Sequence, residues 1–263
     1  MITLQQYDGR ALYLNEAPQK IVSLVPSITE SLILFGKKPV GRTSFCIHPS
    51  YEVKTIPVIG GTKTPKISKI LELSPDLIIA NKEENRSEDV LFLQQSGISV
   101  WTTYPTKIAH VIPWMKELVS ICGNSDISRS ILMECEQFVT QVNVKMNTYC
   151  PRVIPLIWKN PWMGVGEDTY INDLVSVAGG INPVAQKAGR YPILTEEEIF
   201  ELQPEVLLLP SEPYAFNSED RSYWRNRLGL KCKVEFFVGE DLSWFGPRVV
   251  QGLKSLEEML KQI

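Results

Sequence analysis

Short apolar segments alternate with amphipathic segments along this chain, and one pattern occurs twice. Residues 70–79 and residues 199–208 share the same order: the end of a helix, a proline, an acidic residue and an apolar run. The proline ends the helix because it has no backbone N–H and restricts the residue before it. The apolar run is short, as expected of a strand buried on both faces of a parallel sheet. The repeat therefore predicts two similar α/β lobes.

The first half of the chain alternates between predicted strands and helices. Asp8-Gly9 predicts a hairpin turn within residues 2–14. The elements expected after it are strand 21–25, helix 29–35 with a capping box of Ser27 and Glu30, strand 39–42, helix 66–73 after Thr64 and Pro65, strand 77–80, helix 87–95 and strand 98–102. This alternation is typical of a parallel sheet covered by helices.

The middle of the chain has a different pattern. From Asp126 to Tyr149 there is neither Gly nor Pro, and apolar residues recur at steps of three and four, which predicts a single helix ended by Cys150-Pro151. Two shorter helices are the alternative. The elements expected after it are strand 153–158, helix 169–178, a helix capped by Thr195 and Glu198, strand 206–209, strand 234–238 and helix 246–262.

These patterns predict an α/β protein whose two lobes, with mostly parallel sheets, are joined by one long backbone helix. The predicted domains are residues 1–123 for the N-terminal lobe, 124–149 for the connecting helix and 150–263 for the C-terminal lobe. In such proteins a ligand is expected in the cleft between the lobes, at the carboxyl ends of the strands.

Composition narrows the classes of function. The 263 residues are 44% hydrophobic and 22% charged, which is typical of a globular protein, and a net charge of −3 argues against a general nucleic-acid binder. No apolar stretch reaches the roughly 20 residues that span a bilayer, and the first residues lack the features of a signal peptide. We therefore expect either a cytoplasmic protein or the mature form of an exported one. The five cysteines form no CxxC pair.

Aromatic residues at the predicted strand ends are the main functional signal. Large flat side chains there can cover a bulky, flat, partly apolar ligand at a small cost in conformational entropy. The candidate ligand-binding residues of this kind are Phe45, Trp158, Trp162, Trp244 and Phe245. Packing in the core beneath the loops is the alternative for each of them.

Cys46 and His48 lie on one predicted loop and complete the ligand-binding set. A thiolate and an imidazole can ligate a metal, and His48 could also occupy the axial position of a cobalt or iron macrocycle. Glu83 and Glu84 directly follow a predicted strand and could join them around a metal. For Cys46 and His48 the alternative is a buried thiol beside a histidine that makes one hydrogen bond. For Glu83 and Glu84 the alternative is a solvated helix start. A GxSxG elbow and Walker spacing are both absent from the sequence, so we predict no catalytic residues.

Several segments occur in an order that one known family shares: residues 19–30, 40–43, 58–61, 73–80 and 179–182. Over about residues 2–262 the chain resembles the substrate-binding proteins of ABC importers for vitamin B12, haem and ferric siderophores, of the helical-backbone metal receptor type. It is most similar to cobalamin-binding members in Ser243–Arg248 and at Trp158 and Trp162. The resemblance implies a non-enzymatic protein that holds a corrinoid, cobalamin or cobinamide, for ABC-type uptake. Haem, a ferric siderophore or a bare metal ion is the alternative ligand, and an enzyme that processes a small cofactor with Cys46 is a further alternative.

The resemblance also implies a partner and a location. Members of the family present one surface glutamate on each lobe to arginines of a membrane permease. Glu197 fits that position in the second lobe, whereas Ser68 occupies it in the first, so docking to an ABC permease would rest on one acid rather than two. We expect a monomer, located by resemblance in the periplasm or at the cell surface, or in the cytoplasm if Met1 is the native start.

Overall fold

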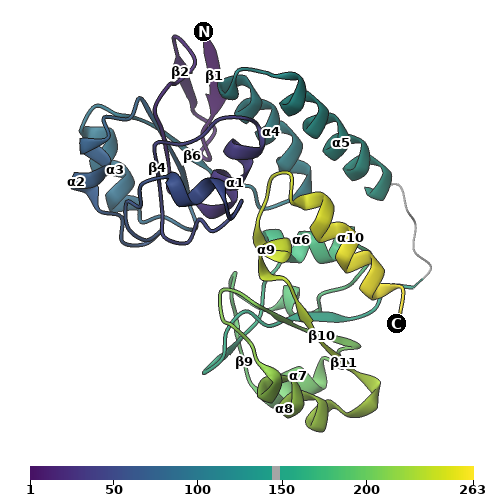
Figure 1. Ribbon diagram of the computed structural model, residues 1–263. Coiled ribbons are helices and arrows are strands. Elements are labelled where there is room, and N and C mark those ends of the chain that lie inside the picture. Colours follow the sequence, from purple (N-terminus) through teal and green to yellow (C-terminus); the bar gives the residue numbers. More distant parts are fainter. Residues whose placement is uncertain (144–148) are drawn as a thin grey trace. The chain divides into compact units, whose positions relative to one another are not determined.

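The computed structural model describes residues 1–143 and 149–263 of the chain (Figure 1). The chain forms two compact units. Unit 1 consists of Met1–Pro105 with Val111–Glu134, and unit 2 consists of Thr106–His110 with Cys135–Ile263. Each unit contains a parallel sheet with helices, which confirms the predicted α/β fold class. The proposed three-part division at residues 123 and 149 stays a prediction.

The sheet of unit 1 has four parallel strands in the order β4-β3-β5-β6. Its central strands β3 and β5 are buried along their whole length, as the apolar runs predict. An N-terminal hairpin precedes the sheet and turns at Gly9, where φ is 85°. The elements of unit 1 are β1 (Ile2–Gln5), β2 (Ala11–Leu14), β3 (Ile21–Ser23), α1 (Pro26–Leu34), β4 (Gly41–Arg42), the 3₁₀ turn Glu52–Thr55, α2 (Ile67–Glu72), β5 (Leu77–Asn81), α3 (Ser87–Gln95) and β6 (Ser99–Thr103).

The sheet of unit 2 has three parallel strands in the order β11-β10-β7. Its core combines strand residues with the fully buried Trp224 of α8. The elements of unit 2 are β7 (Val153–Pro155), β8 (Trp162–Met163), α6 (Tyr170–Val177), the 3₁₀ turn Pro183–Gln186, β9 (Ile193–Leu194), α7 (Glu196–Glu201), β10 (Val206–Pro210), α8 (Ser218–Leu228), the 3₁₀ turn Gly229–Lys231, β11 (Lys233–Phe237), α9 (Gly239–Ser243) and α10 (Val249–Leu260).

The sequence repeat has the same local structure in both units. After α2 and after α7, the residue before the proline adopts a left-handed conformation, with φ of 48° at Ser74 and 47° at Gln203. The acid that follows accepts hydrogen bonds from the backbone at the start of a neighbouring strand. Asp76 accepts from the Lys20 N–H at 3.0 Å, and Glu205 accepts from the Arg152 N–H at 2.9 Å. The repeated acid thus helps fix the position of the adjacent strand.

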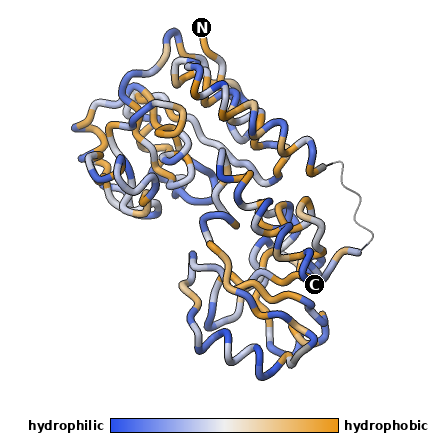
Figure 2. Tube along the Cα trace, turned by 45° about the vertical axis from the view of Figure 1, so that its right-hand side comes forward, coloured by the Kyte–Doolittle hydropathy of each residue, from blue (hydrophilic) through white to orange (hydrophobic). Residues whose placement is uncertain are grey.

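Two helices follow the sheet of unit 1, and the division between the units falls within both. They are α4 (Ile108–Cys122) and α5 (Asp126–Asn143). Hydrophobic and hydrophilic residues alternate along the turns of the long helices in Figure 2, as expected of helices packed on one side. The predicted helix from Asp126 is confirmed as far as Asn143. Its continuation over residues 144–148 lies outside the described residues, and Tyr149 is not helical.

Several predicted boundaries need correction. The first helix begins at Pro26 rather than Thr29, with Val25 as its N-cap, and Ser27 is buried instead of capping. Helix α2 begins at Ile67 with Lys66 as N-cap, because Pro65 pairs with Gly60 in an isolated β-bridge. The predicted capping box of Thr195 and Glu198 on α7 is confirmed.

The sequence reasoning also missed some elements. Helices α4, α8 and α9 and the hairpin of β8 with β9 were not predicted. In α4 the internal Pro113 obscures an otherwise regular apolar pattern. In α8 most residues are polar, so its start is indicated only by the capping box of Asn217 and Asp220.

Candidate functional site

The carboxyl ends of β7 and β10 bring two aromatic side chains together in unit 2. Trp158 lies shortly after β7 and is 43% exposed. Its ring packs edge-to-face against Tyr214, which follows β10, with 5.7 Å between the ring centroids. Tyr214 in turn packs against Phe216 at 4.7 Å. Trp158 is therefore an exposed indole held by an aromatic support, an arrangement suited to contact with a flat apolar ligand.

Trp162 is half-buried and packs against the core of unit 2. Its ring stacks on Phe216 and packs against Trp224, with centroid distances of 6.4 and 5.0 Å. Tyr223 lies against it as well, and the Lys159 ammonium is 5.8 Å from its ring. Lys159 itself pairs with the buried Asp220 carboxylate, which raises the pKa of Lys159. These contacts favour the packing alternative for Trp162, which supports the surface aromatics from below.

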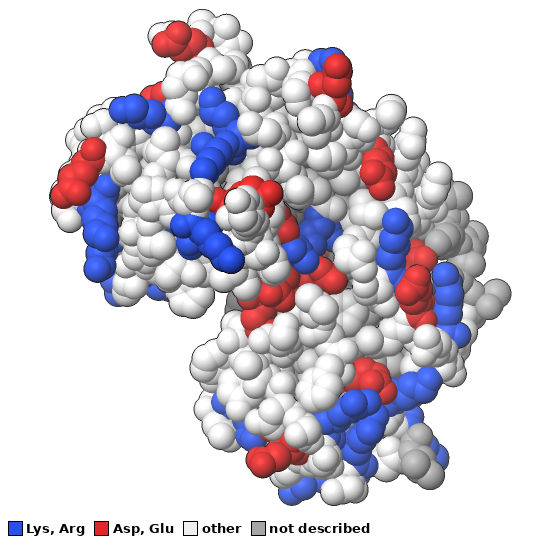
Figure 3. Space-filling view, in the orientation of Figure 1, with Lys and Arg blue, Asp and Glu red and all other residues white. Residues whose placement is uncertain are grey.

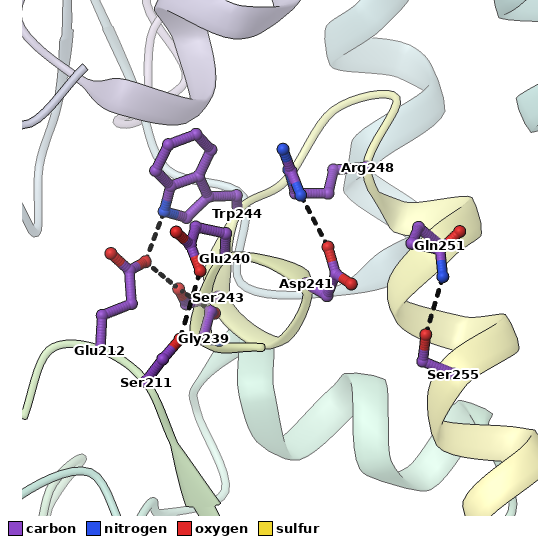
Figure 4. A network of polar contacts seen from close by, with 10 residues as sticks. All are labelled: Ser211, Glu212, Gly239, Glu240, Asp241, Ser243, Trp244, Arg248, Gln251 and Ser255. Atoms are coloured by element: carbon purple, nitrogen blue, oxygen red, sulfur yellow. Dashed lines mark hydrogen bonds and ion pairs between the residues drawn. The ribbon is translucent and has the colours of Figure 1, made fainter. Parts of the chain in front are cut away.

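A polar network surrounds Trp244, between the end of β10 and helix α9 (Figure 4). The Trp244 indole N–H donates to Glu212 Oε1 at 2.6 Å, and the Ser243 hydroxyl donates to the same oxygen at 3.2 Å. The backbone approaches closely here, because a Cβ on Gly239 would lie 2.4 Å from Glu212 Cγ. Glu212 therefore fixes the orientation of the Trp244 ring.

The acidic side chains of this network are only partly neutralised by a nearby arginine. Burial raises the pKa of Glu212, and the nearby Glu240 carboxylate raises it further, while the hydrogen bond from Trp244 lowers it. Arg248 donates to Asp241 Oδ1 at 2.7 Å, and its guanidinium lies 5.3 Å from the Trp244 ring centroid. The segment Ser243–Arg248 is thus tied to α9 by hydrogen bonds and by a cation–π contact.

Phe245 is almost completely buried, at 5% exposed, and lies edge-to-face against Tyr170 with 6.5 Å between centroids. Burial raises the pKa of the Tyr170 hydroxyl. Phe245 therefore acts in packing within unit 2, and its neighbour Trp244 is likewise buried, at 6% exposed.

In unit 1, Phe45 is the exposed member of the predicted set. It follows β4 and is 60% exposed. A Cβ on Gly61 would lie 3.4 Å from Phe45 Cε2, so the ring packs over the Gly61 backbone. The side chain has one face on the protein and the other available to a ligand.

Cys46, on the same loop, has the opposite environment. It is 0% exposed, and its sulfur receives a hydrogen bond from the Thr29 hydroxyl at 3.0 Å and lies 3.2 Å from Thr43 Oγ1. Burial raises the pKa of the Cys46 thiol. The thiol was predicted to contact a ligand, a metal or a substrate, but this placement makes it a packed, protonated group. We therefore leave Cys46 out of the proposed ligand surface.

The other predicted metal ligands do not assemble into a site. His48 is half-buried on the Phe45 loop, and Glu83 and Glu84 are half-buried after β5. The Asn81 side chain accepts hydrogen bonds from the backbone of both glutamates and so shapes their turn. Within the described part of the chain, no group of three or more His, Cys, Asp or Glu side chains could hold a metal ion.

Sequence reasoning missed one cluster at the carboxyl edge of the unit 1 sheet. Lys82 follows β5, and its ammonium lies 5.0 Å from the ring centroid of Tyr7 and 4.9 Å from that of Tyr104. Tyr104 directly follows β6. Lys82 and Tyr104 directly follow two neighbouring strands, and this position could have identified them. Phe45 was selected by the same rule, that ligands bind at the carboxyl ends of parallel strands.

The surface carries charges of both signs. Figure 3 shows basic and acidic side chains in small groups over the visible face rather than one continuous basic surface. Among the helices that the structure describes, none combines the length and the apolar content of a membrane-spanning segment. The cysteines at 46, 122, 135, 150 and 232, all within the described residues, form no disulfide bond.

Comparison with known proteins agrees with this architecture. Residues 21–223 match the family described as periplasmic binding protein. An uncharacterised ABC transporter substrate-binding lipoprotein of Bacillus subtilis, YvrC, is 26% identical over 98% of this chain and 85% of its own length. The crystal structure of the periplasmic vitamin B12-binding protein BtuF of Vibrio cholerae superimposes with a TM-score of 0.82 at 20% identity, covering 94% of this chain and 98% of that one.

A haem-binding protein is also similar in fold. The periplasmic haem-binding protein RhuT from Roseiflexus sp. RS-1 matches with a TM-score of 0.78 at 21% identity, covering 93% of this chain and 98% of that one. The chain belongs to the periplasmic binding protein family. It is a substrate-binding protein rather than an enzyme, which confirms the resemblance found in its sequence.

Proposed function

We propose that this protein binds a corrinoid, cobalamin or cobinamide, and presents it to an ABC-type importer. The observation that carries the proposal is the set of aromatic side chains at the carboxyl edges of both sheets. Phe45 is exposed in unit 1, and Trp158 is exposed in unit 2. Trp244 of unit 2 is only 6% exposed, and its ring is held in place by Glu212.

These side chains match the chemistry of a corrinoid. A corrin ring is broad, largely apolar and rimmed with amides, so aromatic faces can cover it while polar groups bind the rim. The packing of Trp158 against Tyr214 and Phe216 limits its motion before a ligand arrives. Such preorganisation lowers the entropic cost of binding. The similarity in fold to a vitamin B12-binding protein is consistent with this ligand.

Calorimetric or spectrophotometric titration with cyanocobalamin tests the proposal. The wild-type protein should bind, and Trp158→Ala should weaken binding at least tenfold, since a central aromatic contact is commonly worth more than about 1.4 kcal/mol. Tyr13→Ala is the matched control, because Tyr13 is also exposed (63%) but lies on the β2 strand of the hairpin. Absence of heat and of a spectral shift with several corrinoids at high concentration would refute the proposal.

Haem is the second candidate ligand, favoured by the fold of RhuT and by the position of His48 on the same loop as the exposed Phe45. An imidazole there could ligate the iron of a haem. Haem titrations of wild type and His48→Ala discriminate the two candidates. Loss of a haem Soret shift in the variant, with cobalamin binding absent from both proteins, would favour haem. Retained cobalamin affinity in His48→Ala would favour aromatic packing around a corrinoid.

We also propose that Glu197 contacts the permease of the importer. Glu197 is exposed as the second residue of α7, whereas its neighbours Glu196 and Glu198 are engaged by Arg227 and Lys187. Ser68 occupies the same position of α2 in unit 1. Glu197→Lys should reduce ligand delivery to a reconstituted importer without changing corrinoid affinity, and Glu201→Lys on the same helix is the control. Equal delivery by both variants would contradict this role.

A further inference from the structure

One lysine in unit 1 is held between two tyrosine rings at the carboxyl edge of the sheet. The Lys82 ammonium lies 5.0 Å from the ring centroid of Tyr7 and 4.9 Å from that of Tyr104. Two cation–π contacts on one ammonium restrict a side chain that would otherwise sample many rotamers. Lys82 is nevertheless exposed, and so its charge faces solvent.

The backbone around this cluster explains why the three side chains meet. Asn81 and Thr103 are paired residues of β5 and β6, so Lys82 and Tyr104 leave the sheet side by side. The Lys82 N–H donates to the Thr103 carbonyl at 3.0 Å, which continues the pairing beyond the strands. On the other side, the Tyr7 N–H donates to the Thr102 carbonyl at 2.9 Å. The cluster is therefore built on main-chain hydrogen bonds.

The charge of Lys82 is not neutralised by the protein. Within the described residues, Lys82 forms no ion pair with a carboxylate, and its ammonium contacts are the two rings. By contrast, Lys159 and Lys187 each pair with an acid. An ordered but unpaired cation at the edge of a sheet where ligands bind is suited to an anionic group of the ligand.

We propose that Lys82 is a specificity-determining residue that selects ligands carrying an anionic group. This inference rests on the proposed function, corrinoid binding, and assigns the anion to the phosphate in the nucleotide loop of cobalamin. Cobalamin carries a phosphodiester in its nucleotide loop, whereas cobinamide ends in a hydroxyl. The propionates of haem are also negatively charged and are the other source of an anionic group. A lysine held in place strengthens binding of an anion because less side-chain entropy is lost on contact.

The experiment compares ligands that differ only in the anionic group. Cobinamide and cobinamide phosphate are titrated against wild type, Lys82→Met, Lys82→Arg and Lys20→Met. Methionine keeps an unbranched apolar side chain and removes the charge, and arginine restores it. Lys20→Met is the matched control, because Lys20 is an exposed lysine at the amino end of β3, on the opposite edge of the same sheet. Haem and haem dimethyl ester form the second ligand pair.

We expect wild type to prefer cobinamide phosphate about tenfold, Lys82→Met to lose that preference with unchanged cobinamide affinity, and Lys82→Arg and Lys20→Met to retain most of it. The preference should fall as salt rises. An unchanged preference in Lys82→Met, or an equal loss for both ligands, would overturn the inference while leaving corrinoid binding intact. A Lys82 effect confined to the haem pair would support the anion preference and reject the corrinoid. No binding of any corrinoid or haem would remove both proposals.

Discussion

At the residue scale, Glu212 shows how a single side chain can position an aromatic ring. Its carboxylate accepts hydrogen bonds from Trp244 and Ser243 and lies close to the charge of Glu240. Burial and this repulsion raise the pKa of Glu212 above that of an exposed glutamate. The folded state thus binds a proton at Glu212 more tightly than the unfolded state does. The resulting stabilisation is complete below the unfolded pKa and is lost as pH rises through the folded pKa.

This linkage gives a prediction for Glu212→Gln. At neutral pH the variant should unfold at a temperature equal to or a few degrees above that of wild type, because it removes a destabilising charge and keeps an oxygen that accepts from Trp244. The difference should shrink as the pH is lowered through the folded pKa of Glu212. Thermal unfolding followed by circular dichroism between pH 4 and about pH 8 measures it. Glu197→Gln, on the exposed side of α7, is the control.

The prediction has a clear contrary result. If Glu212→Gln is less stable than wild type at neutral pH, the ionised carboxylate contributes more through its hydrogen bonds than it costs through burial. Glu212→Ala should then be worse still, and in any case should lose about 1 kcal/mol or more, since the indole N–H of Trp244 loses its acceptor.

Residue identity alone could not fully distinguish the candidate ligand-binding residues that are exposed from those that pack inside the protein. The aromatic side chains were recognised because they follow predicted strands, and Phe45 and Trp158 are exposed there. Trp162 and Cys46 satisfied the same criterion but point into the protein. The direction of a side chain at a strand end depends on the turn that follows, and neither turn could be derived from local sequence.

At the element scale, the repeated helix–proline–acid–strand segment explains why the two sheets are similar. In both units the acid after the proline binds the backbone at the start of a neighbouring strand. These hydrogen bonds give a partner to the backbone N–H groups directly before β3 and β7. They also help fix the register of those strands in their sheets. The acid is therefore part of the fold and belongs to neither ligand surface.

Removing the acid should destabilise the protein without affecting ligand contacts. We expect Asp76→Ala and Glu205→Ala each to lower the free energy of unfolding by about 0.5–1.5 kcal/mol, below the usual value for a hydrogen bond to a charged group, because both bonds are exposed to solvent. Asp76→Asn should lose less, because its amide oxygen still accepts. Urea denaturation measures these values, with Glu72→Ala on exposed α2 as the control. Equal stability of Asp76→Ala and the control would show that water replaces the carboxylate at no cost.

At the scale of the whole molecule, ligand binding and stability are linked. A ligand that binds only the folded protein raises the free energy of unfolding by RT ln(1 + [L]/Kd), which is about 2.7 kcal/mol at a concentration one hundred times Kd. For a protein of this size we expect cyanocobalamin at that excess to raise the unfolding temperature by roughly 5–10 °C.

Differential scanning calorimetry checks this expectation, with a cobalt salt as the control ligand. The described residues contain no cluster of acids, histidines and cysteines able to bind a bare metal ion, so the salt should leave the transition unchanged. A shift with the cobalt salt equal to that with cyanocobalamin would contradict recognition of the macrocycle.

The sequence by itself determined the α/β class, the internal repeat, the parallel strands and the strand ends at which to look for ligand contacts. These features follow from local chemistry: the periodicity of apolar residues, the missing N–H of proline and the capping of helices. Only the tertiary structure decided which side chains remain exposed. It buried Cys46, packed the half-buried Trp162 against the core of unit 2, held Trp244 through Glu212, and brought Tyr7 and Tyr104 to Lys82. Contacts of this kind join residues far apart in the chain, and their geometry depends on strand pairing and packing that no local pattern specifies.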